Sequence, residues 1–82
     1  MDPTDGLVRI DADESEKGIQ LEYEHVSNLY GQFGIDWYLV KQRVSSHEME
    51  DGSEMVIDTF YVRLSDLSEI QVRFDIRSFY GR

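Results

Sequence analysis

Residues 55–76, MVIDTFYVRLSDLSEIQVRFDI, decide the fold. In the second half of this stretch apolar residues occupy every second position: Ile70, Val72, Phe74 and Ile76. A period of two is typical of a strand with one buried face. The first half predicts another strand, 55–64, in which Asp58 shares one face with Val56, Phe60, Val62 and Leu64. The turn residues 65–67 lie between them, so the two strands are expected to pair in antiparallel fashion.

A third strand is predicted just before this pair. Residues 35–44 are rich in β-branched and aromatic side chains, which favour strands. Trp37 and Leu39 are expected on one face of this strand, with Tyr38, Val40 and Val44 on the other. The turn at 50–53 contains Asp-Gly, a strong hairpin signal, and joins the third strand to 55–64. We expect the core to contain Trp37, Phe60, Val62, Val72 and Phe74.

Residues 15–30 predict an amphipathic helix. Its apolar residues recur at steps of four, three, four and three, as on one face of a helix: Ile19, Tyr23, Val26, Tyr30 and then Phe33. Gly31 is expected to end the helix in a left-handed conformation. The alternation of Ile19, Leu21 and Tyr23 leaves a short strand as the competing interpretation.

The predicted fold class is therefore α+β. One amphipathic helix packs on a three- to four-stranded antiparallel β-sheet, a meander, and residues 6–10 supply the optional leading edge strand. The 82 residues are expected to form a single domain, 1–82, with residues 1–5 as a mobile terminus. A secretory signal and a membrane span are not expected, because no apolar run is long enough for either. The cytoplasm is the expected compartment.

The chain is strongly acidic. Seventeen acids against eight bases give a net charge of −9, and residues 1–31 carry eight of the acids but only two of the bases. Like charge repels nucleic acid and anionic membranes, so we expect neither as a direct partner. A basic protein is the natural complement. Acidity that serves only solubility, or adaptation to a salty cytoplasm, remains an alternative.

No catalytic, cofactor or metal site is expected. The positions of Asp11, Asp13, Ser15 and Glu22 resemble those of the ligands in an EF-hand calcium loop, but Glu16 stands where that loop needs glycine. The chain has no cysteine, and its two histidines are not at ligand spacing from each other. Neighbouring strand residues point to opposite faces, so Ser46 and His47 are not expected to form a nucleophile–base pair.

The sequence therefore predicts a small acidic protein-binding module rather than an enzyme. In its sharper form it is an inhibitor or nucleic-acid mimic, whose carboxylates dock a basic groove of a partner such as a nucleic-acid-binding protein. The candidate partner-binding residues form two clusters, one at the helix and one at the hairpin: Asp11, Asp13, Glu14, Glu16, Glu22 and Glu24, and Glu48, Glu50, Asp51 and Glu54. The alternative is a structural subunit or homodimer that uses its open sheet face.

Overall fold

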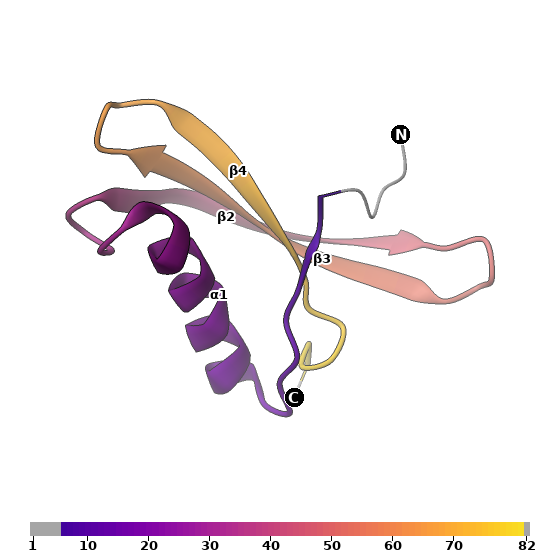
Figure 1. The fold of residues 1–82 in the computed structure, drawn as a ribbon. Helices are drawn as coiled ribbons and strands as arrows, with labels where there is room; N and C mark the ends of the chain where they lie inside the picture. Colours follow the sequence, from indigo (N-terminus) through magenta and orange to yellow (C-terminus); the bar gives the residue numbers. More distant parts are fainter. Residues whose placement is uncertain (1–5, 82) are drawn as a thin grey trace.

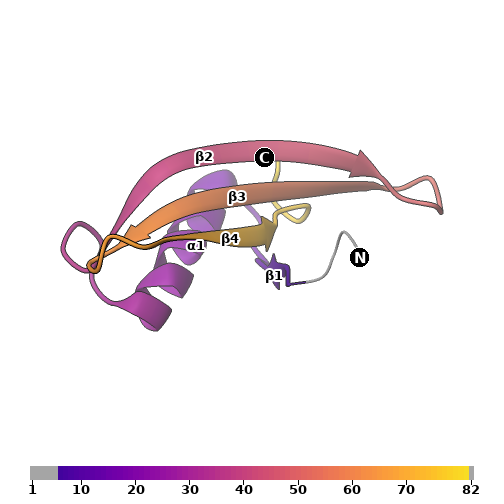
Figure 2. The ribbon, with the colours of Figure 1, turned by 90° about the horizontal axis from the view of Figure 1, so that it is seen from above.

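The computed structural model describes residues 6–81, so the expected mobile terminus, residues 1–5, lies outside the described part of the chain. The elements follow in the order β1 (Val8–Arg9), α1 (Ser15–Tyr30), β2 (Trp37–Glu48), β3 (Glu54–Leu64) and β4 (Glu69–Asp75). Helix α1 lies against one face of a four-stranded sheet, and the hairpin of β2 and β3 extends past the helix (Figure 1). Seen from above, the sheet curves over the helix (Figure 2). The α+β class is confirmed.

The sheet is mixed rather than purely antiparallel. Its strand order is β1-β4-β3-β2, and β2, β3 and β4 form the predicted antiparallel meander. The leading strand pairs in parallel with β4, with Val8 opposite Phe74, so the antiparallel prediction is wrong for this strand. The chain crosses to the helix layer after β1, and the meander then returns β4 beside β1 in the same direction. Ser78 ties the two ends together, because its hydroxyl donates to the carbonyl oxygen of Ile10 over 2.7 Å.

The core lies between α1 and the sheet and combines aliphatic residues with packed aromatic rings. All five predicted core residues are buried, with Val72 the most exposed of them at 9%. The Tyr23 ring on α1 packs edge-on against Phe33 and Phe60, each at a centroid distance of 5.2 Å. Phe60 in turn packs edge-on against Phe74 at 5.1 Å. Edge-to-face pairs of this kind add to the stabilisation that area burial alone supplies.

The buried line of α1 differs from the predicted apolar stripe. Gly18, Glu22 and Val26 are the buried helix residues, at steps of four. Ile19 and Tyr30, which the apolar spacing placed on the core face, are 45% and 38% exposed. The helix turns its Gly18 side toward the core. Because Gly18 has no side chain, the helix can approach the buried ring of Phe79 closely there.

A bulge in β2 reverses the expected faces at its far end. The pairing with β3 shifts between Leu39 and Lys41, so one extra residue enters the strand there. As a result Val44 lies opposite Asp58 on the helix side of the sheet, and its predicted position on the face of Tyr38 is wrong. Each residue beyond a bulge changes face relative to simple alternation.

The helix ends where the sequence predicted. Gly31 follows the last helical residue, Tyr30, and has φ +114° and ψ −154°, a region open to glycine but outside the left-handed helical conformation that we expected. Its amide still donates to the carbonyl of Ser27, and its carbonyl accepts the indole N–H of Trp37 at 3.1 Å. The helix end is thereby fixed to the first residue of β2.

The contact at Gly18 predicts that alanine there destabilises the domain, which is the opposite of what helix propensity predicts. Alanine normally stabilises a helix interior by about 1 kcal/mol relative to glycine. A Cβ on Gly18 would lie 2.5 Å from ring atoms of Phe79, so Gly18→Ala should instead destabilise the domain by roughly 1–3 kcal/mol. Urea denaturation measures the change. In a Phe79→Ala background the same substitution should stabilise, and destabilisation of similar size in both backgrounds would contradict the proposed contact.

Candidate functional site

The ten acidic residues selected from the sequence occupy two exposed surfaces and one buried position. Five are exposed at the start of α1 and along it: Asp11, Asp13, Glu14, Glu16 and Glu24. Four are exposed around the hairpin between β2 and β3: Glu48, Glu50, Asp51 and Glu54. The tenth, Glu22, is 0% exposed. It therefore cannot be part of an acidic docking surface, and its assignment to that surface is wrong.

The first of these surfaces has regular spacing. Glu16 and Glu24 are eight residues apart on α1, and Gln20 lies between them, donating to Glu24 Oε1 over 3.2 Å. Eight residues of a helix rise about 12 Å along its axis. We call Asp13, Glu14, Glu16 and Glu24 the acidic helix surface. Lys17 is the only basic residue between positions 11 and 30.

The hairpin carboxylates have a partly structural role. Asp51 accepts hydrogen bonds from the backbone N–H and the hydroxyl of Ser53, at 2.9 and 2.6 Å. These bonds lower the pKa of Asp51. Glu48 and Glu54 lie opposite each other as the last residue pair before the turn of the hairpin. Like charges in this register repel, which suits a strand pair that ends there.

The basic residues gather on the opposite side of the domain. The strand register places five of them on the sheet face away from α1: Arg9, Lys41, Arg43, Arg63 and Arg73. Arg77 joins them by binding Asp75, whose register neighbours on that face are Arg9 and Ile57. We call this surface the open sheet face. Lys17 is the one base among residues 6–81 that lies elsewhere.

The sequence analysis missed this surface because it counted charges without assigning them to sides. The positions of two arginines along the predicted strands did indicate this surface. In 69–76 Arg73 alternates with core residues, and in 55–64 Arg63 alternates with Val62 and Leu64. Lys41 and Arg43 were hidden by the bulge in β2, which sequence alternation does not reveal.

Several of these bases already have partners. Arg9 pairs with Asp11 at 3.0 Å, and Arg63 pairs with Glu69 at 3.4 Å. The ammonium group of Lys41 lies 5.6 Å from the centre of the Tyr61 ring, within the range of a cation–π interaction. Lys41, Arg43 and Arg73 lie on the same face, between these ion pairs.

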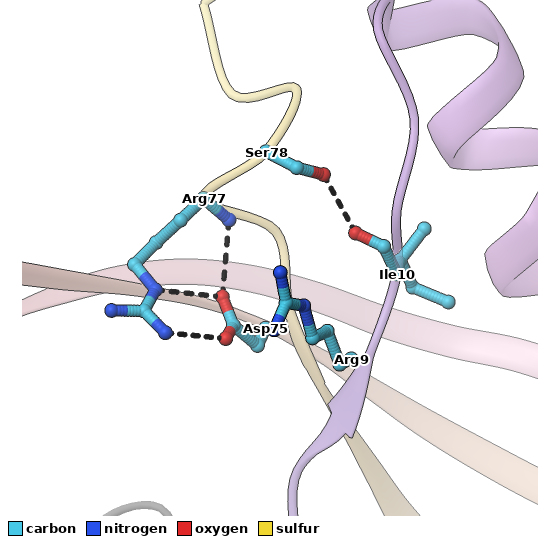
Figure 3. A pocket seen from close by; sticks show the side chains of 5 residues that line it. All are labelled: Arg9, Ile10, Asp75, Arg77 and Ser78. Carbon is cyan, nitrogen blue, oxygen red and sulfur yellow. Dashed lines mark hydrogen bonds and ion pairs between the residues drawn. The ribbon is translucent and has the colours of Figure 1, made fainter.

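A hollow of about 280 Å³ opens at the edge of this face (Figure 3). Its lining comes from β1 and from the end of β4: Arg9, Ile10, Asp75, Arg77 and Ser78. The guanidinium of Arg77 holds both carboxylate oxygens of Asp75, at 3.1 and 2.9 Å. Burial opposes ionisation, but the hydrogen bonds from Arg77 prevail and the pKa of Asp75 lies below its usual value. Since Asp75 satisfies this guanidinium, the cluster fixes the chain end rather than offering a free anion site.

A pair of buried carboxyl groups lies between the helix and the sheet. Glu22 on α1 faces Asp58 on β3, and both are at most 2% exposed. Gln42 donates to Asp58 Oδ2 over 2.8 Å, but both oxygens of Glu22 and the second oxygen of Asp58 find no donor. Burial, and then the hydrogen bond and the charge of Asp58, raise the pKa of Glu22 to about 10. The raised pKa favours the protonated form of Glu22 at neutral pH.

A carboxyl group with a strongly raised pKa often marks an active site, but Glu22 lies in the packed layer between the helix and the sheet. Neither the hollow of Figure 3 nor a second hollow of about 260 Å³ beside α1 includes Glu22 or Asp58 among its lining residues. The pair belongs to the contact between helix and sheet. The arrangement supports a structural role.

The two histidines lie in different surroundings. His25 packs edge-on against Phe74 at a centroid distance of 5.7 Å. His47 is exposed, and its Nε2 lies 3.3 Å from the hydroxyl of Ser45, two residues earlier on the same face of β2. Ser46 faces the other side of the strand, as alternation predicted. The Ser45–His47 contact lies on the exposed surface of β2 rather than in a cleft.

Three further findings concern metal ions, membrane-spanning helices and known proteins. Within residues 6–81, no group of three or more histidine and carboxylate side chains could hold a metal ion. No helix in that range is long and apolar enough to cross a membrane. Comparison of the chain with protein-family models, with curated proteins and with solved structures finds no match.

The buried carboxyl pair predicts how stability depends on pH. Because the folded-state pKa of Glu22 lies above its unfolded value of 4.5, the folded state holds a proton that the unfolded state releases between pH 4.5 and about 10. Stability should therefore fall as pH rises through this range. Glu22→Gln keeps a neutral donor at all pH values, so it should stabilise the domain at pH 8 by roughly 1–3 kcal/mol and have little effect near pH 4.5. Denaturation between pH 5 and 9 tests this.

The matched control is Glu24→Gln, which changes the same chemical group on the exposed side of the same helix. It should leave the slope of stability against pH unchanged. A wild-type slope that survives in Glu22→Gln would show that Glu22 is not the group responsible.

Proposed function

We propose that the chain is a small protein-binding module whose acidic helix surface docks a basic surface of a partner protein. One observation carries the proposal. Six of the seven bases in residues 6–81 lie on the open sheet face, so the carboxylates on the helix side have only Lys17 to offset them. A solubility trait would not require the two signs of charge to be separated in this way.

Charge on one side of a domain acts mainly on the rate at which the domain associates with a partner. A surface of one sign steers an oppositely charged partner and speeds encounter, and salt weakens this effect. Carboxylates at a rigid spacing add charge-assisted hydrogen bonds to arginine once the partner is in place. Glu16 and Glu24 are suited to this role, because both project from the same side of one helix.

The sharper proposal is that the partner binds nucleic acid and that the carboxylates occupy the groove in place of phosphates. The module would then act as an inhibitor without touching nucleic acid itself. This function needs neither cofactor nor catalytic group, and it is compatible with the expected cytoplasmic compartment. The hairpin cluster of Glu48, Glu50, Asp51 and Glu54 extends past the helix and would contact the rim of such a groove.

The alternative, a homodimer with two open sheet faces in contact, is less well supported. A two-fold axis through this face would bring Lys41, Arg43 and Arg73 of one copy against the same residues of the other. Like charges brought together at an interface oppose binding.

A charge-reversal comparison tests the proposal. The probe is a synthetic peptide of ten arginines, and its affinity is measured by calorimetry in 50 mM salt. Glu16→Lys with Glu24→Lys should weaken binding by about tenfold or more, since each exposed carboxylate contributes up to about 1 kcal/mol. Raising the salt to 300 mM should weaken wild-type binding further.

The matched control is Glu48→Lys with Glu54→Lys, which changes the net charge by the same amount at the hairpin. This control should retain more of the affinity than the helix variant. Equal losses in the two variants would mean that the peptide responds to net charge alone, and the docking proposal would fail.

A further inference from the structure

We propose that one end of the domain carries an apolar anchor, which inserts into an apolar pocket beside the basic surface of the partner protein. We call this part of the molecule the apolar end. It consists of the exposed side chains of Leu29, Phe33, Ile35 and Leu67. The inference rests on the proposed function, because it adds a second contact with the same partner.

The apolar end is formed by a loop and a turn that lie at the same end of the sheet. Leu64, the last residue of β3, lies opposite Trp37, the first residue of β2. The loop before Trp37 and the turn after Leu64 are therefore neighbours, as both views of the ribbon show (Figure 1 and Figure 2). Helix α1 ends directly before this loop, with Leu29 in its last turn. The ring of Phe33 packs edge-on against Trp37 at a centroid distance of 4.7 Å, which ties the loop to the core.

The turn between β3 and β4 repeats the geometry of the turn between β2 and β3. In the earlier turn the Gly52 amide donates to the carbonyl oxygen of Met49 at 3.0 Å. In the later turn the Leu67 amide donates to the carbonyl oxygen of Leu64 at 2.9 Å. In each turn an aspartate accepts hydrogen bonds from the backbone N–H and the hydroxyl of the serine two residues later. Gly52 and Leu67 are thus equivalent positions, and both have a positive φ, +86° and +73°.

Leucine is an unfavourable residue at this position of the turn. A positive φ brings the Cβ of an L residue close to the backbone, so glycine or asparagine is the usual choice. Leu67 is the only non-glycine residue with a positive φ within residues 6–81. Its side chain is 77% exposed, so burial within this chain does not offset the strain. The contact that favours leucine here therefore lies outside the chain.

The charge around the apolar end indicates a basic partner. Segments 29–36 and 65–68 contain two acids, Asp36 and Asp66, and no base. Hydrogen bonds from Ser68 lower the pKa of Asp66, so this carboxylate stays ionised at neutral pH. The apolar end thus has the same sign of charge as the acidic helix surface, and it lies at the end of the same helix. A partner surface with bases around an apolar pocket complements both, whereas the apolar ends of two copies would bring like charges together.

Two peptides separate the apolar anchor from the charge. One is the ten-arginine peptide, and the other has the same ten arginines with Leu-Trp-Leu inserted after the fifth. The affinity of the whole chain for each peptide is measured by calorimetry in 50 mM salt. Wild type should bind the second peptide more tightly, because its apolar centre can contact the apolar end. Leu67→Gly should weaken binding of the second peptide by about tenfold and leave the affinity for the ten-arginine peptide unchanged.

The same variant should be more stable than wild type, because glycine adopts the positive φ without strain. Urea denaturation should show this as a higher midpoint. A loss of binding together with a gain in stability is not the result expected of a leucine kept for packing within the chain. Leu67→Asn provides a second variant, because asparagine tolerates this conformation and removes the apolar side chain. The matched control is Tyr80→Ser, which removes an exposed apolar side chain outside the apolar end and should leave both affinities unchanged.

The inference fails if wild type binds the two peptides equally, if Leu67→Gly keeps its affinity for the second peptide, or if its urea midpoint falls. Sedimentation velocity adds a further outcome. Association of wild type that rises with concentration and is lost in Leu67→Gly would assign the apolar end to a second copy and overturn the basic partner. Each of these failures is distinct from failure of the proposed function, which the ten-arginine peptide and Glu16→Lys with Glu24→Lys test separately.

Discussion

The contact between a single helix and one face of the sheet is the constraint on which this domain depends. With 82 residues and no cysteine, the chain must gain its stability from that one packed layer. The helix meets the layer along Gly18, Glu22 and Val26. Gly18 permits close approach, Val26 supplies apolar area, and Glu22 brings in a buried carboxyl group with a raised pKa. The packing and the protonation state of the domain are therefore coupled.

The same layering separates the charges of the surface. The helix covers one face of the sheet and carries carboxylates outward, and the opposite face carries arginine and lysine. Within residues 6–81, the two sides of the domain therefore differ in charge. Interaction with other molecules depends on which surface they meet, and the Debye length of about 8 Å in physiological salt limits how far one surface influences the other.

Local pattern was sufficient to predict most of the fold. The helix from 15 to 30, its end at Gly31 and the three meander strands follow from periodicity and turn residues, as does the burial of Phe60 and Phe74. Long-range geometry was not predictable in the same way. The parallel partner of β1 depends on the path of the chain through space, and the bulge in β2 leaves no mark on composition.

The candidate site, too, could be predicted only in part from local sequence pattern. Nine of the ten selected carboxylates are exposed, because charged side chains seldom enter a core. Glu22 is the exception, and alternation could not reveal it, since the closest line of the helix passes through Gly18 rather than through the centre of the apolar stripe. The basic face needed the register of three strands before Lys41, Arg43 and Arg73 could be placed together.

The pairing of β1 with β4 also sets the order in which the domain can be completed during synthesis. The hydrogen bond from Ser78 to Ile10 joins residues 68 positions apart, and Val8 has no sheet neighbour other than β4. Helix α1 and the β2–β3 hairpin consist of local contacts that form early on a growing chain. Val8 and Arg9 must wait until β4 has left the ribosome, so β1 stays unpaired while α1, β2 and β3 are synthesised.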